Sequence, residues 1–175
     1  MKHLLIRTTK MVTVFTLVLF SVSLIAQEDK SKRPSPPAKV SEKVGNATIT
    51  IDYSQPSVKG REIWGGLVPY GKVWRTGANE ATTFETSTDV KIEGESLKAG
   101  KYGLFTIPES DEWTFIFNSV PDQWGAFEYD ASKDVLRVKV KSQKVDQNTE
   151  KMTFEIDDGM VSLLWEKLKV GFKVE

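Results

Sequence analysis

Strict alternation of apolar and polar side chains is the feature that most restricts what this chain can fold into. The alternation runs through residues 48–53, 136–141 and 168–175. Because successive side chains of a β-strand point to opposite faces, a period of two predicts strands with one buried and one solvated face. No long segment keeps a helical apolar period. Residues 160–168 fit a strand, and they are also the one stretch that could form a short helix.

Turn residues separate these strands at short intervals. Gly94, Gly100 and the segment 108–111 carry the glycine, proline and aspartate typical of turns. The last of them predicts a hairpin whose second strand, 113–118, is apolar on both faces and therefore central. Roughly eight to eleven short strands predict an all-β fold, either an antiparallel β-sandwich of the jelly-roll kind or a flattened barrel.

The N-terminus has the pattern of a signal peptide. Three basic residues precede an uncharged, mostly apolar run over 11–25, and Ala26 offers a small residue for cleavage. Cleavage after Ala26 leaves Gln27 first, and cleavage after Ser23 is the alternative. The run is short for a membrane span, which needs about 20 residues. We therefore expect a periplasmic or secreted protein, with residues 1–26 removed and no stable membrane insertion afterwards.

Composition excludes several kinds of chemistry. The chain has no cysteine, and its one histidine, His3, is lost with the signal peptide. Nucleophile systems built on histidine, and ordinary zinc sites, are therefore unavailable. The remaining 21 basic and 24 acidic residues give a net charge of −3 with no long basic block in the domain, which argues against nucleic-acid binding. No cofactor and no metal are predicted.

Two regions follow the signal peptide. Residues 27–39 are charged and proline-rich, which predicts a disordered linker. Residues 40–175 are predicted to form a single β-sandwich domain. Within that domain the Asp-Gly pair in 156–160 indicates a turn, because the segment lacks the spaced oxygen ligands of a calcium loop.

The segment 59–82 departs from the alternation. It packs three large aromatic side chains among five glycines, with charged and amide side chains between them. Such a loop can be fixed yet irregular, because glycine reaches conformations closed to other residues. Aromatic faces beside planar polar groups suit sugar rings and small polar ligands. The candidate ligand-binding residues are Arg61, Trp64, Tyr70, Trp74, Arg75, Asn79 and Glu80, with Trp124 and Tyr129 as neighbours.

These candidates have predicted roles. The aromatic residues Trp64, Tyr70 and Trp74 would stack on a ligand, the arginines would donate hydrogen bonds, and Asn79 and Glu80 would orient it. A second interpretation stands beside this one. Large aromatics in a small sandwich are more often core than platform, so Trp64 and Trp74 are then mainly buried.

The same residues carry a family resemblance. The motifs are KGRxIWG at 59–65, LVPYGxVWRTGANEAT at 67–82, AGxY at 99–102, WxxxxN at 113–118, and the later WG, YD and DxxRV. Together they resemble an uncharacterised family of exported bacterial proteins known as domain of unknown function 2911. The resemblance implies a secreted all-β domain, typical of Bacteroidetes-type bacteria. It implies no activity, because the family has no established substrate or catalytic residues.

Three functions remain open at this stage. The first is binding of a small polar ligand such as a glycan fragment through the 61–80 loop. The second is a hydrolase that uses two carboxylates about 5 to 9.5 Å apart, Glu80 with Glu128, Asp130 or Asp134. The third is a structural or partner-binding module of the cell envelope. The sequence leaves the oligomeric state open.

Overall fold

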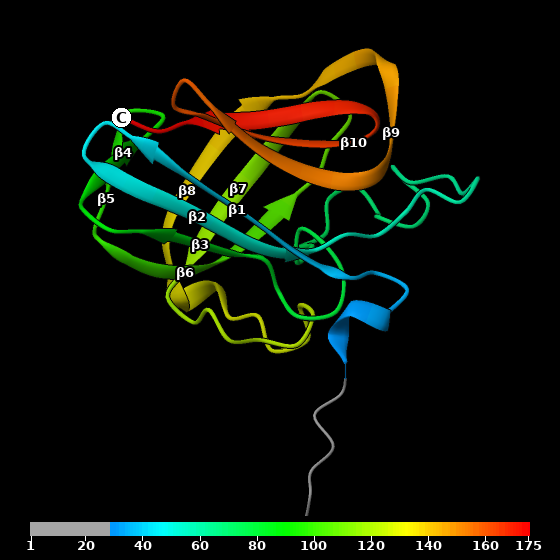
Figure 1. Ribbon diagram of the computed structural model, residues 1–175, viewed down its shortest axis with the longest axis horizontal. Helices are drawn as coiled ribbons and strands as arrows, with labels where there is room; N and C mark the ends of the chain where they lie inside the picture. The colour runs from blue at the N-terminus through cyan, green and yellow to red at the C-terminus, as the bar shows by residue number, and fades with distance from the viewer. Residues whose placement is uncertain (1–28) are drawn as a thin grey trace, which may run out of the picture.

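Ten β-strands and two single 3₁₀ turns make up the described part of the chain, residues 29–175, in a computed structural model (Figure 1). The predicted signal peptide lies outside the described residues. The elements are η1 (Lys30–Lys32), β1 (Pro37–Val44), β2 (Ala47–Ser54), β3 (Thr83–Thr86), β4 (Val90–Ile92), β5 (Glu95–Leu97), β6 (Gly100–Ile107), β7 (Glu112–Asn118), η2 (Ala131–Lys133), β8 (Asp134–Lys141), β9 (Gln143–Asp157) and β10 (Met160–Lys173).

One antiparallel sheet forms the larger layer. Its six strands lie in the order β1-β2-β3-β6-β7-β8, and every pairing between neighbours is antiparallel. Two hairpins, β9–β10 and β4–β5, complete the structure (Figure 1). The sheet does not close on itself, so the all-β antiparallel sandwich is confirmed and the barrel alternative is wrong for the described residues. Residues 160–168 lie within strand β10 and not in a helix.

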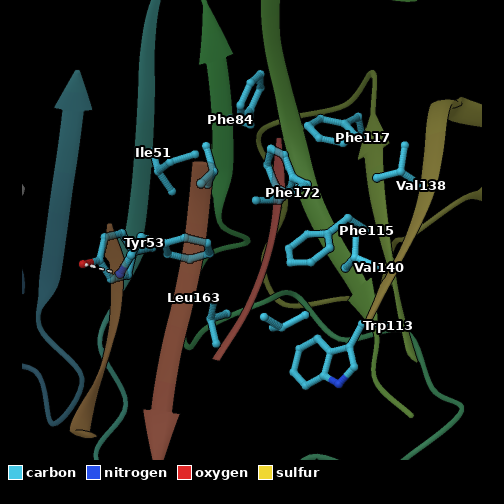
Figure 2. Close-up of a cluster of buried hydrophobic side chains, with 14 of the residues drawn as sticks. Ile51, Tyr53, Phe84, Trp113, Phe115, Phe117, Val138, Val140, Leu163 and Phe172 are labelled. Atoms are coloured by element: carbon cyan, nitrogen blue, oxygen red, sulfur yellow. Dashed lines mark hydrogen bonds between the residues drawn. The ribbon is translucent and has the colours of Figure 1, made fainter. Parts of the chain in front are cut away.

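The core lies between the six-stranded sheet and the β9–β10 hairpin. Alternate residues of the sheet point into it, as the period of two predicts. Figure 2 shows side chains from β2, β3, β7 and β8 facing Leu163 and Phe172 of β10. Tyr53 is tied in as well, since its hydroxyl oxygen accepts a hydrogen bond from the Phe154 backbone N–H at 3.1 Å. Burial of these large apolar side chains is the main source of stability in a domain without disulfides.

The long β9–β10 hairpin bends so that the two ends of β10 meet. Glu166 has a positive φ of 54°, and the pairing register shifts on both sides of it. A bulge of this kind bends a strand sharply. As a result the Val174 N–H donates to the Gly159 carbonyl at 2.7 Å, across the predicted Asp-Gly turn. The bend lets one hairpin cover the inner face of the sheet from end to end.

The linker predicted over 27–39 differs from what the structure shows. Residues 37–39 belong to strand β1, and Ser35 and Pro36 hydrogen-bond to the domain through their carbonyl oxygens. Proline and charge are typical of disorder when no partner is near. Here the partners lie elsewhere in the chain, beyond the reach of a local pattern.

The close return of β10 predicts a large effect of Gly171→Ala. An added Cβ would fall far inside van der Waals contact with the Val161 carbonyl oxygen, so backbone has to move. We expect a loss of about 3 kcal/mol in the free energy of unfolding, because backbone cannot yield as a flexible side chain can. Gly60→Ala is the control: its site is open but has a φ of +67°, so only about 1 kcal/mol is expected. Equal losses in urea denaturation of the two variants would contradict the close approach.

Candidate ligand-binding hollow

The face of the sheet turned away from the hairpin has a small apolar cluster of its own. Ala81, Phe105 and Ile116 are buried there, with side chains of the 119–130 segment packed on them. This explains why β7 is apolar on both faces, as the sequence predicted. The 119–130 segment therefore covers this outer face over β6 and β7.

A hydrogen-bonded cluster holds the end of that segment. The Tyr129 hydroxyl donates to Asp134 Oδ2 at 2.6 Å, and Arg137 donates to the same oxygen at 2.8 Å. Asn118 donates to the other oxygen, Oδ1, at 2.8 Å. Burial and then the Asp134 carboxylate raise the pKa of Tyr129 to about 12, so its hydroxyl stays a donor at neutral pH. The predicted neighbour Tyr129 therefore braces the loop, and its oxygen is already engaged.

Four tryptophans meet at the inner side of the sandwich. Trp64, Trp74, Trp113 and Trp165 have ring centroids 4.9 to 6.3 Å apart, mostly edge to face. Trp74, Trp113 and Trp165 are buried and Trp64 is half-buried against the core. Edge-to-face pairs are favourable beyond the area they bury. Trp64 and Trp74 thus pack as core side chains, in agreement with the second interpretation of the sequence.

Both ends of the 74–82 loop are hydrogen-bonded to strand β6. The backbone of Trp74 exchanges hydrogen bonds with Thr106, and the Leu104 N–H donates to the Thr82 carbonyl. Inside the loop, Thr76 is fully buried with a positive φ of 56°, and its carbonyl accepts from the Thr82 hydroxyl at 2.7 Å. A β-branched residue in this conformation is strained, and it persists only where its surroundings fix it.

Beside this loop a hollow of about 500 Å³ opens on the outer face of the sheet. Trp124 lines it with its side chain 55% exposed. The segment that carries Trp124 pairs with the loop, because the Ala81 N–H donates to Gln123 and the Gly125 N–H to Asn79. The charged side chains that line the hollow are Lys30, Asp52, Glu80, Lys101 and Asp122.

Two buried residues that line the hollow each have an oxygen without a partner. Thr83 Oγ1 and Gln123 Oε1 are enclosed, and no described group hydrogen-bonds to either. Gln123 is held by its amide nitrogen, which donates to the Val120 carbonyl at 2.7 Å. Buried polar atoms in native proteins nearly always have a partner, so two orphans at one hollow call for an explanation. No sequence pattern marks such atoms, and sequence reasoning missed both.

Glu80 is the most strongly paired residue at the hollow. Arg33 Nη1 lies 2.9 Å and 3.1 Å from its two carboxylate oxygens, and Lys30 Nζ lies 2.8 Å from Oε1. Partial burial favours the neutral acid, but the hydrogen bonds from Lys30 and Arg33 outweigh it and lower the pKa of Glu80 to about 2. Glu80 is therefore a fixed negative charge, and it is poorly suited to act as a general acid near neutral pH.

The other predicted residues are spread apart. Arg61 donates to the backbone carbonyls of Val58 and Ser57, and Tyr70 is an exposed ring in the 65–71 turn. Asn79 donates to the Ser35 carbonyl at 2.9 Å. Arg75 is half-buried, its Nε has no partner, and burial lowers its pKa. Only Glu80 and Trp124, of the nine candidates, line the hollow.

Grouped metal ligands and a membrane-spanning helix are both absent from residues 29–175. No three side chains of histidine, cysteine, aspartate or glutamate are grouped there in a way that could hold a metal ion. None of the helical segments in this range is long and apolar enough to span a bilayer.

Comparison with known families gives a match over most of the chain. The family model described as "Protein of unknown function (DUF2911)" matches residues 35–174, which is nearly all of the described chain. No curated protein and no solved structure matches. The matched range begins just after Arg33 and Lys30, so the residues that neutralise Glu80 lie outside it.

The lowered pKa of Glu80 predicts a pH-dependent effect of Glu80→Gln. A carboxyl group with a pKa of about 2 in the folded state and about 4.5 in the unfolded state stabilises the fold above pH 4.5. That contribution is lost as the pH falls from 4.5 through 2. Because the Glu80 side chain is 39% exposed, screening limits it to about 1 kcal/mol at pH 7.

Urea denaturation of both chains at pH 7, 4 and 2 measures this effect. We expect Glu80→Gln to be less stable at pH 7 and equal to the original chain near pH 2. Glu95→Gln, at an exposed position of β5, serves as the control and should show no such convergence. A constant difference at all three pH values would contradict the assignment.

Proposed function

Because this chain belongs to the DUF2911 family, whose description assigns no function, we propose a function from its own site. We propose that the protein is an exported binding module that takes a small polar ligand, a glycan fragment, in the hollow beside Trp124. The observation that carries the proposal is the pair of unpartnered buried oxygens of Thr83 and Gln123 at that hollow. A ligand hydroxyl is the kind of group that would give these oxygens a hydrogen-bond donor.

The size and lining of the hollow support a small ligand. Ligand sites commonly measure about 300 to 1,000 Å³ and combine apolar surface with a few placed polar groups. Here the apolar surface comes from Trp124, two prolines and two alanines, and the polar groups come from charged side chains of both signs. Because the Thr83 and Gln123 oxygens are enclosed in the present state, a small adjustment of the wall accompanies binding.

A sugar fits these groups better than a flat apolar molecule does. The exposed indole of Trp124 offers a face for the C–H groups of a sugar ring, while Asp122 and Lys101 can accept from and donate to its hydroxyls. The stacking role that the sequence analysis gave to Trp64 and Trp74 passes in this proposal to Trp124, since the other two rings pack in the core.

A carboxylate-dependent hydrolase is the second candidate, and the charge states favour it less. A glycosidase needs one carboxylic acid with a raised pKa. Every described carboxyl group with a resolved shift has a lowered pKa, namely Asp29, Glu80, Asp89, Asp130 and Glu175. Turnover that disappears in Glu80→Gln while the fold survives would favour the hydrolase over the binding module.

A structural or partner-binding module is the third candidate. Its support is Phe127, which is 87% exposed on the same 119–130 segment and does not line the hollow. An exposed aromatic ring next to the hollow could meet a protein partner. Because a single ring is a small surface, the hollow carries the proposal.

Export has its own test. We expect the protein isolated from its native cells to begin at Gln27, after cleavage that follows Ala26, and to be found in the periplasm or the medium. N-terminal sequencing and intact mass measure this. A protein that keeps Met1 and fractionates with the cytoplasm would contradict export.

The binding proposal predicts different outcomes for Trp124 and Phe127, two aromatic residues of the 119–130 segment. A panel of neutral mono- and oligosaccharides, screened by array and then titrated by calorimetry, should yield ligands. Trp124→Ala should weaken their binding at least about tenfold, because stacking area is lost at the hollow. Phe127→Ala, equally a truncation but outside the hollow, should leave affinity unchanged. Equal losses in both variants, or no ligand in the panel, would contradict the proposal.

Thr83→Val separates a ligand role from a structural one. Its hydroxyl oxygen has no partner in the structure, so its removal should leave the free energy of unfolding unchanged or raise it. Binding of the same saccharides should nevertheless weaken. Undiminished binding in a stable Thr83→Val chain would show that this oxygen does not touch the ligand.

A further inference from the structure

Residues 29–36 lead into strand β1 (Figure 1), and Lys30 of this segment lines the hollow. We call this segment the strap. It begins with the η1 turn and ends where the Gln55 N–H donates to the Pro36 carbonyl at 2.9 Å. Lys30 is one of the residues that line the hollow, so the strap forms part of its wall.

The strap places a guanidinium group in the corner between Glu80 and Trp124. Arg33 Nη1 bonds to both oxygens of the Glu80 carboxylate, and the guanidinium carbon of Arg33 lies 5.8 Å from the centre of the Trp124 ring. The Arg33 side chain is only 13% exposed. A carboxylate beside an aromatic face is the arrangement that recognises a cation. In this structure the corner already holds a cation, the guanidinium group of Arg33.

Polar contacts hold the strap, and apolar packing contributes little to it. No residue from 29 to 36 is buried, and the segment adds no side chain to the hydrophobic core. Segments with few buried apolar contacts open at low free-energy cost. The Lys30–Glu80 ion pair adds little, because both side chains are exposed and water and salt screen the pair. The strap is therefore the part of the site most easily displaced.

Departure of the strap would change the charge of the hollow. Lys30 and Arg33 would leave with it, while Glu80 and Asp122 would remain and Lys101 would be the one cation of the lining. Asp52, also at the hollow, pairs with Lys39 at 3.2 Å and is neutralised in either state. The open site would consequently attract a positive group to the same corner.

We propose that the Glu80–Trp124 corner is a cation subsite, occupied in the resting protein by Arg33 of a displaceable strap, and that ligands carrying an ammonium or guanidinium group compete with it. This inference rests on the proposed function and narrows it to glycans or similar small molecules with a positive charge, such as amino sugars. Neutral saccharides would fill the remainder of the hollow without displacing Arg33.

The test uses the full mature chain with the strap loosened by substitution. Lys30→Gln together with Arg33→Gln removes both cations from Glu80. Lys32→Gln is the matched control, because Lys32 is 83% exposed and pairs with Asp29 inside the strap. The probes are L-argininamide and L-citrullinamide, both with the α-amino group acetylated, so that the first carries one cation, the guanidinium, and the second has the same shape and no charge. Backbone and Trp124 indole signals in ¹H–¹⁵N spectra report binding and confirm the fold.

The loosened chain should bind L-argininamide at least about tenfold more tightly than the original chain and Lys32→Gln do, with shifts at Trp124 and Glu80. L-citrullinamide should produce no saturable shifts. Adding Glu80→Gln to the loosened chain should abolish the response. Equal affinity in loosened and control chains, equal binding of the two probes, or binding that survives Glu80→Gln would each overturn the inference.

The two proposals fail in different ways. If neutral saccharides bind the hollow but L-argininamide never reaches the corner, the binding function stands and the cation subsite falls. If L-argininamide binds the loosened chain and no saccharide binds any chain, the subsite stands and the glycan assignment falls. Glucosamine and glucose, titrated side by side, test both proposals at once. The two sugars differ by one ammonium group, so a difference in their affinities reports on the cation subsite.

Discussion

The fastening of the 74–82 loop to strand β6 is the constraint on which the site depends. Trp74 anchors the loop in the tryptophan cluster, and its indole N–H donates to the Gly77 carbonyl at 3.1 Å. Thr76 keeps a strained backbone because the Thr82 hydroxyl bonds to its carbonyl. With its base fixed in this way, the loop presents Asn79 and Glu80 on the outside. The buried tryptophans therefore fix the loop from inside the core.

The hollow exists because the outer face of the sheet is only partly covered. The 119–130 segment, braced by the Tyr129 and Asp134 contacts, packs over β6 and β7. Toward β1 and β2 that cover stops, and Trp124 lies at the boundary beside Asp52. The strap closes part of the remaining opening with polar contacts. Core packing thus fixes most of the wall of the hollow, and a segment held by polar contacts completes it.

Local patterns in the sequence were sufficient to predict the fold class. The period of two located the strands, and the apolar residues on both sides of 113–118 predicted a central strand. The uncertain segment 160–168 is a strand because the β9–β10 hairpin pairs along it, which is a tertiary effect. The bend at Glu166 has no signal in the sequence, because glutamate is not a residue type that favours a positive φ.

The site was less accessible to sequence reasoning. Aromatic density drew attention to Trp64 and Trp74, but density alone does not tell a core cluster from a platform. The strap was read as disordered because its partner, Glu80, lies 47 residues from Arg33. Glu80 and Trp124 were among the candidates, and the structure brings both to the hollow. Thr83 was not, because a hydroxyl without a partner is a property of packing alone.

The hollow is the place where we propose that a ligand meets the protein. A crystal structure of the mature chain soaked or grown with glucosamine tests this directly. We predict density for the sugar ring against Trp124, a ligand oxygen within hydrogen-bond distance of Thr83 or Gln123, and a displaced Arg33. A sugar bound elsewhere, with Arg33 still on Glu80 and the hollow holding only solvent, would contradict the account.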